Sequence, residues 1–171
     1  MAVGSRTLMT YEYGAKNGLL TKQTYANGAS ASFQYDALGR STKTTTSSGD
    51  EYTYQYTGDG QLYELTDKNG GSPIRYTYNY DTIGRLIGTG QTGGTSELWA
   101  SYQYDTNNRL TRMNYSIPGV VDNATESFYY NGDGSKITAD IPNASKGVLK
   151  SMALFSNSWI TYSYDDLSRL T

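Results

Sequence analysis

Aromatic and polar residues alternate along much of the chain, and this period of two predicts β-strands. Tyr52, Tyr54 and Tyr56 alternate with Thr53 and Gln55, and the same spacing recurs at 76–80. Successive side chains of a strand point to opposite faces of a sheet, so one face should be aromatic and the other polar. Helical spacing is absent from these segments, and the chain is therefore predicted to be all-β.

The strand pattern occurs seven times, and each copy ends in an aromatic-x-Tyr pair. Successive copies are 21 to 26 residues apart, except for a gap of 34 residues between the last two. With such a short period each copy buries little surface alone and depends on its neighbours, so residues 1–171 are predicted to form one array of repeats. The second Tyr of each pair is Tyr13, Tyr35, Tyr56, Tyr80, Tyr104, Tyr130 or Tyr164.

A short Asp-x-x-Gly-Arg motif follows the Tyr in the clearest copies and predicts a tight turn. Asp36 suits the first position of a type I turn, and Gly39 suits the left-handed position that closes it. Asp36 and Arg40 should then face each other at the base of the turn, and Tyr35 should pair with Ser41. We expect the charged pair on the face opposite the tyrosines. There the charged pair would mainly fix the register of the two strands and would add little stability, because such a pair contributes roughly 0.2–1 kcal/mol.

The charges of this turn are present or absent together, which supports their pairing. Four copies carry both, as Asp36/Arg40, Asp81/Arg85, Asp105/Arg109 and Asp165/Arg169. Three copies carry neither, with Gly14/Leu19, Thr57/Gln61 and Asn131/Ser135 at the same places. Asn108 and Ser168 replace the turn glycine; Asn tolerates a positive φ, whereas Ser should strain its turn. A leucine one residue further on should pair with the tyrosine, as Tyr56 with Leu62, Tyr80 with Leu86, Tyr104 with Leu110 and Tyr164 with Leu170.

Two strands and two reversals in each copy give about 14 strands in an antiparallel meander. Open sheets of more than about ten strands usually curl or split, so the predicted fold is an array of β-hairpins in one long, curled meander sheet. An irregular insertion at about 140–157 interrupts the period, and residues 143–155 fit either an extra strand or a short helix. Both ends of the chain fall inside a copy, so we expect both ends to be truncated.

Composition excludes several classes of function. The chain has no Cys and no His, which removes disulfides, the common zinc ligand sets and every Ser-His or Cys-His mechanism. Neighbouring carboxylates such as Asp165 and Asp166 point to opposite faces of a strand and form no natural dyad. A net charge of −2 provides no basic stripe for nucleic acid, and no apolar run is long enough to span a membrane. We predict no catalytic, cofactor-binding or metal-binding residue and no cofactor.

The motif Tyr-x-Tyr-Asp-x-x-Gly-Arg-Leu at this spacing resembles the YD-repeat, or Rhs-repeat, family. The copies at Tyr35, Tyr80, Tyr104 and Tyr164 keep the Tyr-Asp dipeptide and the Arg, and the seven copies cover nearly the whole chain. In that family the repeats are β-hairpins that spiral into a large hollow shell. Toxin complexes and teneurins are similar in architecture, and bacterial members enclose a C-terminal toxin domain. The Asp-Pro junction of members that release a toxin is missing here.

The resemblance implies a non-catalytic wall segment of a secreted or cell-surface bacterial protein. Its partners would be the flanking repeats and the C-terminal domain of the parent protein. Unpaired sheet edges also predict self-association of the chain by edge pairing or strand exchange. The alternative is an adhesion module that binds carbohydrate or cell wall through exposed tyrosines. Regular Tyr at a strand period is more often packing, however, and only Trp99 and Trp159 supply the larger ring.

Overall fold

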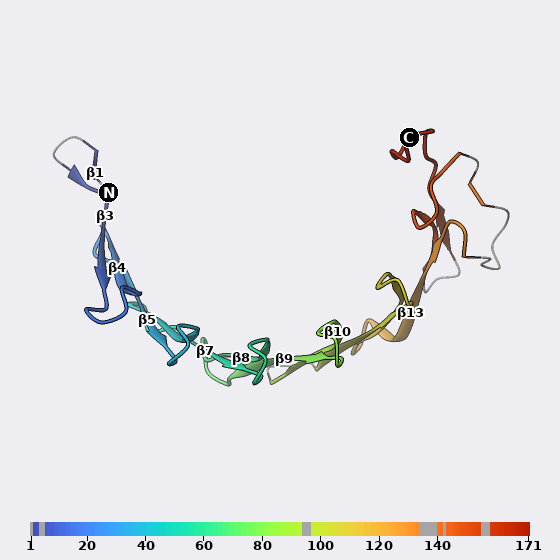
Figure 1. The fold of residues 1–171 in the computed structure, drawn as a ribbon. Coiled ribbons are helices and arrows are strands. Elements are labelled where there is room, and N and C mark those ends of the chain that lie inside the picture. Colours follow the sequence, from blue (N-terminus) through green and yellow to red (C-terminus); the bar gives the residue numbers. More distant parts are fainter. Residues whose placement is uncertain (1, 4–5, 94–96, 134–139, 142, 155–157) are drawn as a thin grey trace. The chain divides into compact units, whose positions relative to one another are not determined.

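The computed structural model describes residues 2–3, 6–93, 97–133, 140–141, 143–154 and 158–171. These residues form strands and turns, and no helix occurs among them (Figure 1). Thirteen strands make one antiparallel sheet in which every strand lies between its neighbours in sequence. The all-β meander predicted from the alternating pattern is therefore confirmed. No helix in this part of the chain is available to span a membrane.

The strands have the following bounds. A separate two-stranded sheet pairs β1 (Ala2–Val3) with β2 (Arg6–Thr7). The large sheet contains β3 (Met9–Tyr13), β4 (Leu20–Tyr25), β5 (Ser30–Tyr35), β6 (Ser41–Thr46), β7 (Glu51–Tyr56), β8 (Leu62–Asp67), β9 (Ile74–Tyr80), β10 (Leu86–Thr92), β11 (Leu98–Tyr104), β12 (Leu110–Ile117), β13 (Val121–Tyr130), β14 (Leu149–Ala153) and β15 (Trp159–Thr161). Six of the seven repeated tyrosines are the last residue of a strand, because the turn begins directly after them.

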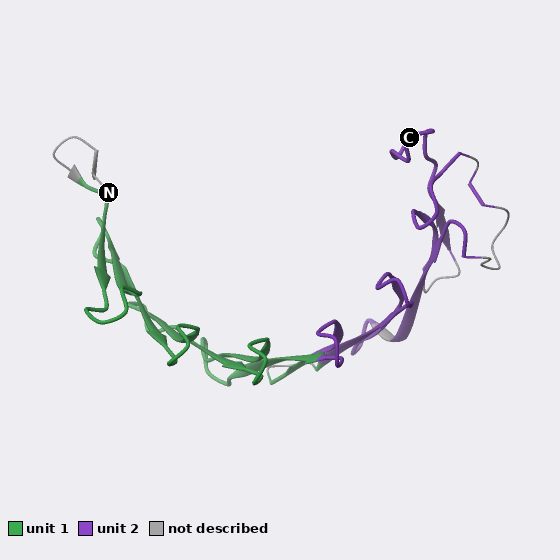
Figure 2. Cartoon of the chain, viewed as in Figure 1, with its two compact units in different colours: residues 1–79, 90–97 green, residues 80–89, 98–171 purple. Residues whose placement is uncertain are grey.

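The chain divides into two compact units, which are described separately (Figure 2). Unit 1 comprises residues 1–79 and 90–97, and unit 2 comprises residues 80–89 and 98–171.

The turns of unit 1 have the predicted geometry. The backbone N–H of Asp36 donates to the carbonyl of Arg40 at 2.9 Å, and the N–H of Gly39 donates to the carbonyl of Asp36 at 3.1 Å. Gly39 has a φ of 81°, in the left-handed region that favours glycine. Tyr35 pairs with Ser41 as predicted, and a β-bulge before Tyr35 accommodates the extra residue of the partner strand. Tyr56 pairs with Leu62 in the same way.

Unit 2 repeats this turn with other residues at the left-handed position. Asn108 has a φ of 63° and Ser168 a φ of 61°. Tyr104 pairs with Leu110, and Tyr164 forms a single bridge with Leu170. Ser168 thus keeps the geometry of the glycine turns and adopts a conformation that is costly for an ordinary side chain, as the sequence predicted.

The hairpin β13–β14 differs because its turn is replaced by a long connection. Tyr130 pairs with Leu149, and the N–H of Asn131 donates to the carbonyl of Val148 at 2.8 Å. The irregular segment that the sequence predicted at about 140–157 therefore contains the regular strand β14, and the connection begins earlier, at Asn131. Residues 149–153 form a strand and not a helix, because Leu149 takes the place of the leucine that pairs with a repeat tyrosine. Ser135 lies outside the described residues.

The sheet is a single layer with two unlike faces. In each unit we call the side that carries the repeat tyrosines the tyrosine face, and the opposite side the polar face; the tyrosines are Tyr54 and Tyr56 in unit 1, and Tyr104 and Tyr130 in unit 2. Among the described residues, Ala124 is the only hydrophobic residue that is buried. The repeated structure is therefore not held by a central hydrophobic core, and contacts between successive hairpins must supply much of its stability.

Candidate functional site: an arginine–tyrosine ladder

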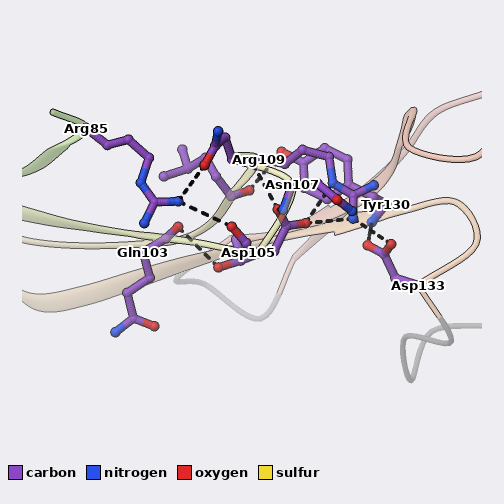
Figure 3. A network of polar contacts seen from close by, with 10 residues as sticks. Arg85, Gln103, Asp105, Asn107, Arg109, Tyr130 and Asp133 are labelled. Atoms are coloured by element: carbon purple, nitrogen blue, oxygen red, sulfur yellow. Dashed lines mark hydrogen bonds and ion pairs between the residues drawn. The ribbon is translucent and has the colours of Figure 1, made fainter. Parts of the chain in front are cut away.

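The site is built from the turns upward, starting with the aspartate. In the hairpin β11–β12, one carboxylate oxygen of Asp105 accepts hydrogen bonds from the backbone N–H groups of Asn107 (2.8 Å) and Arg109 (3.0 Å). Its other oxygen accepts a bond from Nε of Arg109 at 2.7 Å (Figure 3). These bonds, first among them that from the Arg109 backbone, hold the pKa of Asp105 below its usual value. The Asp105 carboxylate therefore both closes the turn and orients the arginine side chain.

The oriented arginine lies against the tyrosine of the next hairpin. Cζ of Arg109 lies 4.4 Å from the centroid of the Tyr130 ring, well within the range of a cation–π contact. The same contact recurs between Arg85 and Tyr104 at 4.9 Å and between Arg40 and Tyr56 at 4.7 Å. The prediction that the charged pair lies on the face opposite the tyrosines is therefore wrong. The guanidinium extends out of the turn and covers the neighbouring ring.

The tyrosine hydroxyl in turn bonds back to the preceding hairpin. Oη of Tyr130 donates to the carbonyl of Leu110 at 2.8 Å, one residue after the arginine that covers its ring. The same bond to the strand before recurs along the described chain, from Tyr35 to Leu20, Tyr56 to Ser41, Tyr104 to Leu86, Tyr130 to Leu110 and Tyr164 to Leu149. We call the repeated pair of contacts the arginine–tyrosine ladder.

Further polar contacts strengthen individual rungs. Nη1 of Arg85 donates to the Asn108 side chain at 2.9 Å and to the backbone carbonyl of Asp105 at 3.3 Å. Arg109 also forms an ion pair with Asp133, at 2.7 Å. Asn108 thus has two roles, because it takes the left-handed position of the turn and receives the arginine of the preceding hairpin.

The ladder continues in part where the charges are missing. Leu19 and Val148 take the place of the arginine before Tyr35 and Tyr164, and both tyrosines still donate to a backbone carbonyl. The hydroxyl bond is therefore the common element of the rungs, and the cation is added where an Asp–Arg turn precedes. Arg169 keeps its bond to Asp165, but its side chain is 72% exposed and covers no ring in the described part of the chain.

These contacts engage the hydroxyls of the ladder tyrosines and place an arginine over the rings of Tyr56, Tyr104 and Tyr130, which disfavours them as an exposed surface for sugars. Burial raises the pKa of Tyr130 above its usual value, consistent with a hydroxyl that stays protonated and donates. Asp165, a candidate considered for acid–base chemistry, is held inside its turn by Arg169. In the described residues no three His, Cys, Asp or Glu side chains gather to hold a metal ion.

Residues 16–51, which include strands β4 to β6, match the sequence model of the RHS Repeat family. The chain carries an RHS repeat. The resemblance expected from the Tyr-Asp and Arg motif is thus confirmed. A search of curated proteins found no match to the chain.

Solved structures that include a Tc toxin share the fold of this chain. A chain of the TcdB2-TccC3-Cdc42 crystal structure is 17% identical over 95% of the present chain, with a TM-score of 0.64. A chain of the Photorhabdus luminescens Tc holotoxin pore, which carries the TccC3 mutation D651A, is 16% identical over 96%, with a TM-score of 0.65. The present chain spans only 11% of each of those chains. At this identity the likeness establishes the fold.

The reasoning from sequence did not find the contact between arginine and tyrosine. The local pattern of one hairpin pairs Arg109 with Asp105 alone. A signal was present, because every turn arginine except Arg169 is followed by a further aromatic-x-Tyr pair one period later. That signal connects two hairpins, and only their side-by-side placement shows its meaning.

Proposed function

We propose that this chain is a non-catalytic segment of the wall of a β-sheet shell, in which a secreted or cell-surface bacterial Rhs protein encloses or presents a C-terminal, toxin-like domain. The observation that carries the proposal is the arginine–tyrosine ladder. Each rung joins one hairpin to the next, so the structure can be extended by further repeats without a central core. A wall that grows by repetition needs such nearest-neighbour contacts.

Two further observations support a structural role. The side chains that recur in the repeat, such as Asp105, Arg109 and Tyr130, make their contacts within the sheet. The solved structures that share the fold are parts of Tc toxin assemblies, and their chains are about nine times longer than the matched region. Both observations fit a wall segment that encloses another domain.

The test uses the full-length protein that contains this chain. Limited proteolysis should leave its C-terminal domain intact while the repeats are folded, and should digest that domain quickly once it is expressed alone. Weakening the wall with Arg85→Gln and Arg109→Gln together should speed the digestion. Arg112→Gln, which removes a charge from the polar face outside the ladder, is the matched control.

Two results would contradict the proposal. The C-terminal domain could be digested at the same rate with and without the repeats, which would show that nothing encloses it. Electron microscopy of the full-length protein could instead show the repeats as an open arm with the C-terminal domain outside.

A further inference from the structure

Four Asn-Gly dipeptides occur in the chain, at residues 17–18, 27–28, 69–70 and 131–132. In this dipeptide the asparagine side chain is open to attack by the next backbone nitrogen, because glycine places no Cβ beside that nitrogen. The attack closes a five-membered ring and releases ammonia. All four dipeptides share this chemistry, so the surrounding structure decides which of them reacts.

The reversal between β8 and β9 contains Asn69 and Gly70. The backbone N–H of Asn69 donates to Oδ1 of Asp67, and Oδ1 of Asn69 accepts the backbone N–H of Glu51, both at 2.9 Å. Gly70 is exposed, and within the described part of the chain its N–H donates to no acceptor. Gly70 and Gly71 have φ values of 75° and 117°. The nitrogen that would attack Asn69 is therefore free and solvated.

In two other Asn-Gly turns the glycine nitrogen is occupied. The N–H of Gly18 donates to the carbonyl of Gly14, and the N–H of Gly28 donates to the carbonyl of Tyr25, each at 2.9 Å. Each bond must open before the nitrogen can lose its proton and add to the side chain. The asparagines of these two turns are more exposed than Asn69. The difference therefore lies in the hydrogen bond and not in access to solvent.

Asn131, in the fourth dipeptide, is protected at each reacting group. It is only 4% exposed, its Oδ1 accepts the N–H of Ile141 at 2.9 Å, and its Nδ2 donates to the carbonyl of Ala144 at 2.8 Å. The N–H of Gly132 donates to Oδ1 of Asp140 at 3.0 Å. Neither the attacking nitrogen nor the leaving amide is free at this position.

The contact with Glu51 also favours reaction at the side chain of Asn69. Negative charge develops on Oδ1 when a nitrogen adds to Cγ, and the N–H of Glu51 already donates to that oxygen. The Nδ2 group, which would leave as ammonia, makes no hydrogen bond within the described residues. Of the four dipeptides, this one thus combines a free nucleophile, a polarised carbonyl and a free leaving group.

We propose that Asn69 is a site of spontaneous modification, at which the folded protein converts asparagine to aspartate and isoaspartate. The nitrogen of Gly70 bonds to Cγ of Asn69, and the Nδ2 group leaves as ammonia with the proton that the nitrogen gives up. One water molecule then opens the ring at either carbonyl. The net change consumes one water and releases one ammonia, and nothing is oxidised or reduced.

The modification changes how β7 is held at the reversal. Aspartate keeps an oxygen that accepts the N–H of Glu51. Isoaspartate instead routes the backbone through Cγ, which adds a carbon to the main chain and displaces the acceptor oxygen. The isoaspartate form therefore loses the contact with Glu51. This site is independent of the proposed wall function, since a wall segment can carry it or lack it.

The experiment follows the full, folded chain by peptide mass spectrometry during incubation in mildly alkaline buffer. Trypsin gives separate peptides for the four dipeptides, at residues 17–22, 23–40, 69–75 and 113–136. The mass gain of an amide that becomes an acid should appear in 69–75 at least about fivefold faster than in 17–22 or 23–40. This is the difference expected when one hydrogen bond must open first. The gain at Asn131 should come last.

The unfolded chain and two matched variants make the test specific. In urea all four dipeptides should react at similar rates, because no turn then holds the glycine nitrogen. Asn69→Gln should abolish the gain in 69–75 and leave that in 23–40 unchanged, since glutamine would have to close a larger ring. Asn27→Gln should have the converse effect.

Hydrogen exchange at the amide of Glu51 reports the consequence for the structure. In the incubated chain the isoaspartate fraction should exchange this amide roughly fivefold faster, as expected for one lost hydrogen bond. Asn69→Asp, which has the aspartate side chain on an unchanged backbone, should keep the amide protected. Amides of β5 and β6 should be unaffected in both.

Three results would overturn the proposal. Residues 69–75 could gain no mass while 23–40 do. The three dipeptides in unit 1 could react at one rate in the folded chain, which would show that the turn bonds do not matter. The preference for Asn69 could also persist unchanged in urea, which would assign it to the flanking sequence and not to the structure.

Discussion

The guanidinium carbon of Arg109 lies 4.4 Å from the centre of the Tyr130 ring, although the two residues belong to different hairpins. The hydroxyl of the same tyrosine bonds to Leu110, the neighbour of that arginine. Each of these contacts needs the next hairpin to be in place. The charged pair of the turn, which in isolation would only set a register, thus becomes part of the connection between repeats.

Replacing Arg109 by Gln should loosen the contact between β12 and β13. The change removes the cation–π contact and the ion pairs with Asp105 and Asp133, and should lower the local stability by about 1–2 kcal/mol. Native-state hydrogen exchange measures this, because repeat arrays open locally and not as one cooperative unit. Amides of β13 should exchange roughly five- to thirtyfold faster.

Arg169→Gln is the matched control for that change. Arg169 has the same bond to its turn aspartate but covers no described ring, so its loss should leave exchange in β13 unaltered. Equal effects of the two variants would show that the turn bond, and not the contact with Tyr130, is what matters.

Replacing Tyr104 by Phe should remove one hydroxyl bond and little else. The bond to the carbonyl of Leu86 is 2.8 Å long and partly shielded, so its loss should cost about 1 kcal/mol. Thermal unfolding followed by circular dichroism detects the change. Tyr13→Phe should have no effect, because that side chain is 61% exposed and makes no such bond. An unfolding temperature of Tyr104→Phe equal to that of the unchanged protein would show that the hydroxyl bond does not stabilise the ladder.

Replacing Gly39 by Ala should destabilise the turn between β5 and β6 through its backbone alone. Gly39 has a φ of 81°, and an added Cβ would meet only a Leu19 methyl group at the ordinary distance of 3.7 Å. The left-handed conformation should therefore account for the cost of about 1–2 kcal/mol. Gly58→Ala is the control, since its added Cβ meets nothing within 4 Å and its φ is not left-handed. Urea denaturation should separate the two variants.

Stability should fall in acid because of the turn aspartates. Hydrogen bonds, first from the backbone N–H of the following arginine, hold the pKa of Asp36, Asp105 and Asp165 below the ordinary value of 3.8. The unfolded chain therefore takes up protons before the folded chain does. The stabilisation is complete above about pH 5 and is lost as the pH falls below about 4. A urea midpoint that stays constant from pH 6 to about pH 3 would contradict this.

Stability should also fall in alkali, for the opposite reason. Burial raises the pKa of Tyr56, Tyr130 and Tyr164 above the ordinary value of 10.0. The unfolded chain loses these protons first, so the stabilisation is complete below about pH 9 and declines as the pH rises beyond about 10. Tyr130→Phe should reduce the slope of that decline, which ultraviolet absorbance and circular dichroism can follow together.

The hairpins could be predicted because their determinants are local. Asp36, Gly39 and Arg40 lie within five residues, and the turn that they favour requires Tyr35 to pair with Ser41. The alternation of Tyr with polar residues assigns the faces for the same reason, since it follows from strand geometry. The direction of Arg40 could not be predicted in this way, because it depends on the ring that the next hairpin places beside the turn.

The connection between β13 and β14 shows the same limit. No Asp–Arg turn follows Tyr130, so the sequence offered no local partner for it, and Leu149 was assigned to an irregular segment. The structure pairs Tyr130 with Leu149 because β14 lies beside β13 in the sheet, whatever the length of the loop before it.

The amino-acid sequence alone therefore determined the strands, the turns and the repeat, all of which follow from contacts between residues close in the chain. The tertiary structure decided which side chains join one hairpin to the next. The physical reason is that these contacts arise between strands aligned by the sheet, at separations that no local pattern specifies.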